Sequence, residues 1–163
     1  QDAVIGVDLS LKLLREAKNL INDVVCCDVE RGLPFRDGFF DVISAQEIIE
    51  HVLDTDYFVK ECYRCLKAGG ILVLSTPNLA GLGCRIALLL GKRPWPVEYR
   101  LGKDSAGHMR CFTVRDLKQL LANYNFSVNK ITTNMIKLGP IKLRFRMFPQ
   151  IGLHIIFQAR KIQ

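Results

Sequence analysis

The chain has 163 residues, of which 49% are hydrophobic and 24% charged, so it has the size and composition of one globular domain and not of a disordered segment. Its formal net charge is +7, and its basic residues are spread along the chain, with four in segment 92–103 and six in segment 137–161. No apolar run reaches the ~18 residues of a transmembrane helix. The pattern of a nucleic-acid-binding module is absent, so we do not expect a nucleic-acid partner.

Six cysteines raise the question of disulfides or a metal site. Cys26 and Cys27 lie in an apolar stretch that predicts a strand, and Cys62 and Cys65 lie in a predicted helix. Buried cysteine commonly behaves as a small apolar residue. The C-x-x-C at 62 and 65 leaves zinc open, but a second pair with metal spacing is missing. We therefore expect reduced thiols, no metal and a cytoplasmic protein, and we expect no signal peptide because the first residues lack the basic and apolar segments of one.

Three short apolar runs in the first part of the chain each end in a polar residue. Residues 3–8 predict a strand that ends at Asp8, and residues 24–27 predict a strand that is followed by Asp28. Ser10 is placed to cap a helix between these two strands. A third strand, over 39–45, is followed by the polar side chains of 46–51. Ligands bind at the carboxyl ends of parallel strands, so we expect these polar groups along one edge of a sheet.

The second part of the chain continues the alternation of helix and strand. Core spacing predicts a helix over 55–67 that ends at Gly69-Gly70, and then a strand over 71–75 that is covered on both faces. A helix is predicted over 79–90. Thr113 and Asp116 have the spacing of a capping box at the start of another helix. Two more strands, 126–133 and 153–160, complete the chain as an antiparallel pair.

Five segments carry a resemblance that covers nearly the whole chain. In this order and spacing they are typical of class I S-adenosylmethionine-dependent methyltransferases of the small-molecule, "type 11" kind, which the chain therefore resembles. The segments are VIGVDLS (4–10), DVERGLPF (28–35), FDVISAQEIIEHV (40–52), LKAGGILVLSTPN (66–78) and HMRCFT (108–113).

The resemblance implies a fold and a cofactor. The fold is α/β, a Rossmann-like, doubly wound and mostly parallel sheet with a C-terminal antiparallel hairpin. The cofactor is S-adenosylmethionine. Asp8, with Leu9 beside it, matches the position that binds the ribose. Asp28 and Val29 match the positions that bind adenine, and Gln46 matches a position beside the cofactor.

One departure from the family pattern concerns its first strand and glycine-rich loop. These should precede Val4, and they are not found. In the resembling fold that strand lies between the strands at 3–8 and 39–45, so its loss leaves two edges without partners. We therefore interpret residues 1–163 as a single methyltransferase-like domain that is truncated at its N-terminus or completed by another segment. Whether this chain binds the cofactor without the loop is left open.

Residues 47–51 carry the densest group of ionisable side chains. If they are helical, then Glu47, Glu50 and His51 share one face. One interpretation is structural, with acids at a helix N-terminus and a packed histidine. The other is that E-x-x-E-H resembles the magnesium site of ubiquinone-pathway O-methyltransferases and small-RNA 2'-O-methyltransferases, with His108 as a fourth ligand. We favour the first and predict no metal, with His108 and His51 as candidate general bases.

The predicted function is methyl transfer from S-adenosylmethionine to a small-molecule or lipophilic acceptor. Residues 79–107 match the insertion that forms a lid over the acceptor in the family. Their apolar helix, with Trp95, Lys92 and Arg93, also suits peripheral contact with a membrane, while covering the sheet is the simpler role. His154, in the last predicted strand, is interpreted as structural. The alternative function is a catalytically silent module that keeps the fold for binding. The acceptor and the oligomeric state are not predicted.

Overall fold

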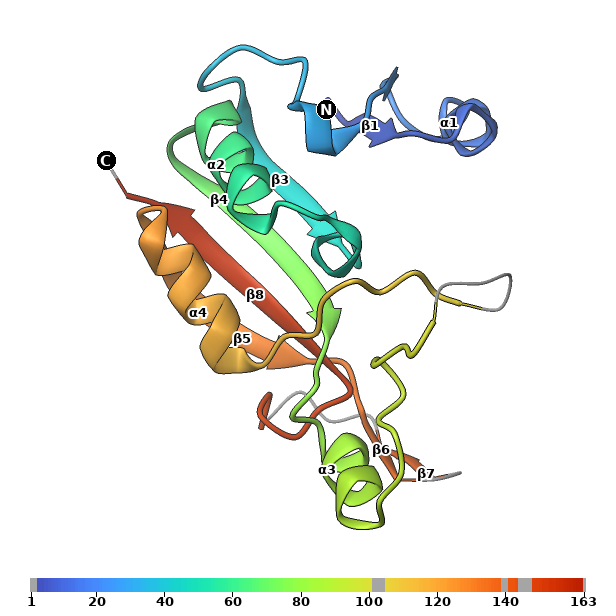
Figure 1. The fold of residues 1–163 in the computed structure, drawn as a ribbon. Coiled ribbons are helices and arrows are strands. Elements are labelled where there is room, and N and C mark those ends of the chain that lie inside the picture. The colour runs from blue at the N-terminus through green and yellow to red at the C-terminus, as the bar shows by residue number, and fades with distance from the viewer. Residues whose placement is uncertain (1–2, 101–104, 139–140, 144–147, 163) are drawn as a thin grey trace.

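The computed structural model describes residues 3–100, 105–138, 141–143 and 148–162, and shows an α/β fold (Figure 1). The lid predicted over 79–107 therefore lies partly outside the described residues, at 101–104. The elements in chain order are β1 (Ile5–Asp8), α1 (Leu11–Ala17), β2 (Asp23–Cys26), the 3₁₀ turn η1 (Val29–Arg31), β3 (Phe40–Gln46), the 3₁₀ turn η2 (Ile49–His51), α2 (Thr55–Cys65), β4 (Leu66–Pro77), α3 (Leu82–Leu89), α4 (Val114–Asn123), β5 (Phe126–Thr133), β6 (Ile136–Leu138), β7 (Ile141–Leu143) and β8 (His154–Lys161).

The main sheet has four strands in the order β3-β4-β8-β5. β3 and β4 are parallel, whereas β8 is antiparallel to both β4 and β5. The predicted mixture of parallel strands with a C-terminal antiparallel pair is thus confirmed. A short β6–β7 hairpin lies in the connection between β5 and β8.

The helices α2 and α4 lie over the same face of the main sheet (Figure 1). Their apolar residues, among them Phe58 and Leu117, form the core with Leu72, Leu74 and Phe157 of β4 and β8. Buried and half-buried residues alternate over residues 70–74 of β4 and 154–159 of β8, and the last four residues of β4 are all buried. Within the described residues, 71–75 are thus fully covered on one face and partly covered on the other.

Local capping signals in the sequence are confirmed. The Ser10 side chain accepts a hydrogen bond from the backbone N–H of Leu13 at the start of α1. Thr113 and Asp116 form both halves of the capping box at the start of α4. Each bond satisfies a backbone group that the first helical turn leaves unpaired.

The predicted boundary between α2 and β4 is wrong. The helix ends at Cys65 and β4 begins at Leu66, so Gly69 and Gly70 lie inside the strand and not at a helix end. The pairing with β3 shows why, because Phe40 pairs with Leu66 but Val42 pairs with Ile71. The residues between these pairs form an irregularity in β4, where Gly69 takes φ +74° and a Cβ on Gly70 would lie 2.9 Å from the carbonyl oxygen of Lys67. Glycine tolerates both constraints.

β1 and β2 form a separate parallel pair. Within the described residues, the ladder hydrogen bonds of this pair do not extend to β3. Side chains of both sheets, including Val7 of β1 and Val42 and Ala45 of β3, line an apolar cavity of about 160 Å³. Val42 remains 53% exposed. The gap expected between β1 and β3 is thus present in the structure.

A two-stranded ladder has marginal stability in water, so we expect β1 and β2 to open more readily than the main sheet. Native-state hydrogen exchange checks this. Amides of β1 and β2 should exchange through an opening with a lower free energy than amides of β4 and β8. Equal protection in both sheets would show that the pair is held by contacts stronger than its own ladder.

Candidate functional site

Two acids stand at the carboxyl ends of the parallel strands β1 and β2. Asp8 is the last residue of β1, and one of its carboxylate oxygens accepts a hydrogen bond from the backbone N–H of Ser10 at 2.7 Å. Asp28 caps η1 by accepting from the backbone N–H of Glu30 at 3.1 Å. The backbone joins the two strand ends, because the N–H of Cys27 donates to the carbonyl of Asp8 at 3.1 Å. Both carboxylates are only partly buried. The second oxygen of Asp28 lies 3.4 Å from Nε of the exposed Arg31, in an ion pair.

The end of β2 is tied to the turn after β3. The Glu30 carboxylate accepts from the backbone N–H of Leu53 at 2.8 Å, two residues after η2. The acids of the first sheet and the ionisable residues 47–51 therefore belong to neighbouring segments. Of the other predicted cofactor-binding residues, Leu9 is 68% exposed and Val29 packs against the core. Gln46 is exposed at the end of β3, where its side chain donates to the hydroxyl of Ser44.

The loop after η1 lines a cavity and is anchored to α2. Its apolar residues Leu33 and Phe35 line the cavity between β1 and β3. Their carbonyl oxygens accept hydrogen bonds from the Arg64 guanidinium of α2 at 2.9 and 2.7 Å. Glu61 and Asp37 pair with the same arginine. The loop is thus anchored firmly enough to present an apolar surface beside the two acids.

Residues 47–51 do not form the expected helical face. Glu47 takes a left-handed conformation, with φ +55°, and only Ile49–His51 form a 3₁₀ turn. For a residue other than glycine this backbone is uncommon and is typical of functional sites. The turn sends Glu47 and Glu50 to different partners, so the i, i+3, i+4 spacing does not describe their arrangement.

Hydroxyl groups at the end of β4 hold both glutamates. Ser75 donates to Glu47 at 2.7 Å, and Thr76 donates to Glu50 at 3.0 Å. Glu50 is 1% exposed, and its other oxygen, Oε1, has no hydrogen-bond partner among the described residues. Burial raises the pKa of the Glu50 carboxyl above its ordinary value. A buried carboxylate oxygen without a donor is a costly feature.

All three histidines of the chain gather around its one tryptophan. The Trp95 ring lies 6.0 Å from the His108 ring and 5.7 Å from the His154 ring, and the His51 ring lies 5.1 Å from that of His108. His154 also lies against Glu47, with 3.3 Å between Nε2 and the carboxylate. The structure thus brings the predicted residues His51 and His108 together. It also places His154, which we expected to be structural, beside the same tryptophan.

The ring nitrogens of His51 and His108 are oriented in the same way. Nδ1 of His51 lies 3.0 Å from the carbonyl oxygen of Gly107, and Nδ1 of His108 lies 3.2 Å from that of Pro96. A carbonyl oxygen only accepts, so each Nδ1 carries a proton, and Nε2 of the neutral ring is left as a base. The ligand atoms of Glu50, His51 and His108 lie within 4.8 Å of one another. The same set could therefore accept a proton from a bound acceptor or hold a divalent cation.

Thr76 and Asn78, at the end of β4, use their side chains within the protein, and both are fully buried. Thr76 is engaged with Glu50, and the Asn78 side-chain NH₂ donates to the carbonyl oxygens of Pro149, Gln150 and Gly152. The side-chain oxygen of Asn78, Oδ1, accepts from the backbone N–H of Ala80 in the turn before α3. Thr76 thus positions Glu50, and Asn78 forms part of the wall of a cavity under Trp95.

Cys62 and Cys65 take no part in the candidate site. All six are described and free, which agrees with the expected reduced state. Cys62 and Cys65 are buried, and burial raises the pKa of both thiols. Neither belongs to the cluster that could hold a metal ion. They are therefore packing residues of α2.

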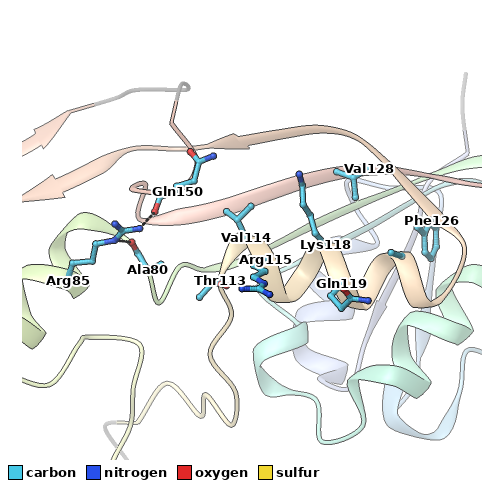
Figure 2. Close-up of a pocket in the computed structure, with 11 residues that line it drawn as sticks. Ala80, Arg85, Thr113, Val114, Arg115, Lys118, Gln119, Phe126, Val128 and Gln150 are labelled. Carbon is cyan, nitrogen blue, oxygen red and sulfur yellow. Dashed lines mark hydrogen bonds between the residues drawn. The ribbon is translucent and has the colours of Figure 1, made fainter.

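A cavity larger than the one between β1 and β3 lies away from the histidines. It has a volume of about 750 Å³ and lies along α4 and β5, next to the segment before α3 (Figure 2). Arg85, Arg115 and Lys118 line it, and Arg85 is held by the carbonyl oxygens of Ala80 and Gln150. It contains no residue of the histidine cluster, so its size does not make it the candidate site. A smaller cavity of about 240 Å³, lined by Trp95 together with α3 and Leu153, adjoins the cluster.

Comparison with known proteins agrees with this fold. The family model described as "Methyltransferase domain" matches residues 2–74. A possible histamine N-methyltransferase of Thermotoga maritima, described as S-adenosylmethionine-dependent, has a solved structure that superposes with a TM-score of 0.73 at 23% identity. That superposition covers 96% of this chain and 72% of the other, and shows the shared fold.

Sequence relatives are similar to less than half of this chain. A ubiquinone biosynthesis O-methyltransferase of Bradyrhizobium diazoefficiens is 41% identical over 81 residues, which are 46% of this chain and 31% of that protein. A probable S-adenosylmethionine-dependent methyltransferase of Mycolicibacterium smegmatis is 46% identical over 55 residues, which are 31% of this chain and 21% of that protein. The matches thus span a third or less of these curated relatives.

The buried Glu50 makes a prediction about pH. Because its pKa is raised in the folded state, folding holds a proton there that the unfolded chain releases near the ordinary value of 4.5. The free energy of unfolding therefore falls as the pH rises above 4.5, because Glu50 must then ionise in a buried site, and Glu50 has no such effect below pH 4.5. Glu50→Gln should raise Tm at pH 8 by about 2–4 °C, the effect of ~1 kcal/mol in a domain of this size, and by less at pH 4.5.

The measurement is a pair of thermal unfolding curves at each pH, in the presence of a chelator. Asp41→Asn, at an exposed ion pair with Lys67, is the control and should show no comparable gain. A gain for Glu50→Gln that is equal at both pH values would contradict the burial of a charged form.

Proposed function

We propose that this chain transfers a methyl group to an oxygen atom of a small lipophilic acceptor. Through residues 2–74 the chain belongs to the methyltransferase domain family, and it has the class I S-adenosylmethionine-dependent fold. The observation that carries the proposal is the placement of Asp8, Asp28 and Glu47–His51 at the carboxyl ends of β1, β2 and β3, all inside the matched segment. The name of the Bradyrhizobium relative supports oxygen as the acceptor atom.

The residues at the first sheet fit the adenosine half of S-adenosylmethionine. Asp8 and Asp28 each use one oxygen on a local backbone N–H, and the other oxygen of Asp28 also faces the exposed Arg31. Each carboxylate still has lone pairs that suit the hydroxyl and amino groups of the cofactor. Leu33 and Phe35 supply an apolar surface next to them. The bound cofactor supplies an activated methyl group on its sulfonium. Transfer breaks the bond from sulfur to methyl and forms the bond from methyl to the acceptor oxygen.

The histidine cluster is suited to the acceptor side of this reaction. The acceptor hydroxyl loses its proton, and Nε2 of His108 or His51 is the base that takes it. The 240 Å³ cavity under Trp95 is mainly apolar in its lining, with Cys84, Ala87 and Leu153, and can take the body of the acceptor. Positioning supplies much of the rate, because the methyl group is already activated.

Cofactor binding is the first test. Asp28→Asn keeps a residue that caps η1 well but removes the charge, and should weaken S-adenosylmethionine binding about tenfold in calorimetry. Asp23→Asn is the matched control. It changes an exposed aspartate at the opposite end of β2 and should bind as the unchanged chain does. Equal binding by both variants would contradict the assignment of Asp28.

A chain that binds no S-adenosylmethionine would favour the alternative function, a catalytically silent binding module. The cofactor assay therefore separates the two functions before an acceptor is known. The same assay in the presence of an added peptide that carries a strand and glycine-rich loop would show whether the gap beside β1 limits binding.

The second test concerns the base. With a catechol that carries an alkyl chain as acceptor, His108→Gln and His51→Gln should lower kcat, by about 100-fold for the residue that takes the proton. His154→Gln is the control, because it alters the third histidine under Trp95 but can still donate to Glu47. A loss that is equal for all three variants would indicate a packing role and not proton transfer. Methylation of histamine in place of the catechol would overturn the choice of oxygen.

A further inference from the structure

The C-terminal end of α3 exposes an unbroken run of leucines. Leu88, Leu89 and Leu90 are 59%, 86% and 65% exposed, and of the residues of α3 only Cys84 is buried. In Figure 1, α3 stands beyond the end of the main sheet, beside the β6–β7 hairpin, and does not lie over a face of the sheet. The simpler expectation, that this helix covers the sheet, does not account for these leucines.

Basic and aromatic side chains follow the leucines directly. Lys92, Arg93 and Arg100 are exposed, as are Trp95 at 47% and Tyr99 at 72%. Arg93 and Arg100 lie over the Tyr99 ring, 5.0 and 5.3 Å from its centroid. We call Leu88–Leu90, Lys92, Arg93, Trp95, Tyr99 and Arg100 the α3 tip. Leucine, tryptophan and tyrosine beside lysine and arginine are the residues that proteins place at a lipid headgroup boundary.

The net charge of residues 82–100 indicates which kind of surface the α3 tip fits. Residues 82–100 contain four basic side chains and one acid, Glu98, which accepts a hydrogen bond from Ser105. A second group of exposed leucines lies around α1, at Leu9, Leu11, Leu13 and Leu20. There, residues 8–23 contain three basic and three acidic side chains, so that surface carries no net charge. Of these two groups of exposed leucines, only the one at α3 is accompanied by net positive charge.

From this combination we infer that the α3 tip docks on the surface of an anionic lipid bilayer. The leucines enter the boundary between headgroups and acyl chains, Trp95 and Tyr99 lie at the headgroup level, and Lys92, Arg93 and Arg100 contact lipid phosphates. The described residues contain no helix long and apolar enough to cross a membrane, so this contact is peripheral. Trp95 also touches His108 and His154, which places the docked surface directly beside the candidate site.

The inference has its own test, because vesicle binding needs neither cofactor nor acceptor. Trp95 is the one tryptophan of the chain, so its emission reports on the α3 tip. The probe is a vesicle of phosphatidylcholine with about 30% phosphatidylglycerol, against phosphatidylcholine alone. Anionic vesicles should shift the Trp95 emission to shorter wavelength and carry the chain in flotation, and raised salt should weaken both effects.

Two variants of the α3 tip test its apolar and basic parts. Leu89→Ser should lower the vesicle partition coefficient about tenfold. Reversing two charges with Lys92→Glu and Arg93→Glu should lower it tenfold or more. Leu20→Ser is the matched control, because Leu20 and Leu89 are both 86% exposed, and it should bind as the unchanged chain does. Circular dichroism establishes that each variant is folded.

Three results would overturn the inference. Equal binding to neutral and anionic vesicles would remove the role of charge. An equal loss for Leu20→Ser and Leu89→Ser would show general adhesion of apolar surface. If no vesicle binding is found and light scattering shows a dimer that Leu89→Ser dissociates, then a second copy of the chain, and not lipid, covers the α3 tip.

Discussion

The candidate site depends on the hydrogen bonds made by the carboxyl end of β4. Over four residues, Ser75 and Thr76 hold the two glutamates, Pro77 pairs with His154, and Asn78 gathers the carbonyl groups of the 149–152 segment. These groups are buried, so a lost hydrogen bond there leaves a polar atom without water or partner, at a cost of about 1–3 kcal/mol. The chemistry of the cluster is thus fixed by a strand that contributes no reactive group of its own.

This arrangement explains which features the sequence could predict. Signals that depend on neighbouring residues, such as the caps at Ser10 and Thr113, agree with the structure because they need only a few residues of local chain. The strands that end at Asp8 and Gln46 could be predicted from their apolar runs, and with them the acids of the first sheet. Asp28 was found in the same way, although β2 ends two residues earlier, at Cys26.

The features that the sequence did not predict depend on distant segments. Gly69 and Gly70 have the pattern of a helix end, but pairing with β3 and β8 draws them into β4. Glu47 adopts its left-handed backbone because Ser75 of another strand binds both its backbone and its side chain. His154 enters the site only because β8 returns antiparallel beside β4, and nothing in its neighbourhood along the chain indicates this.

The gap between β1 and β3 has a consequence for how the protein behaves in concentrated solution. Among the described residues, neither β1 nor β3 has a strand paired to the edge that faces the other. Unpaired strand edges are the template on which strands of separate molecules add to one another. A ligand or peptide that pairs with these edges would therefore also oppose association between molecules.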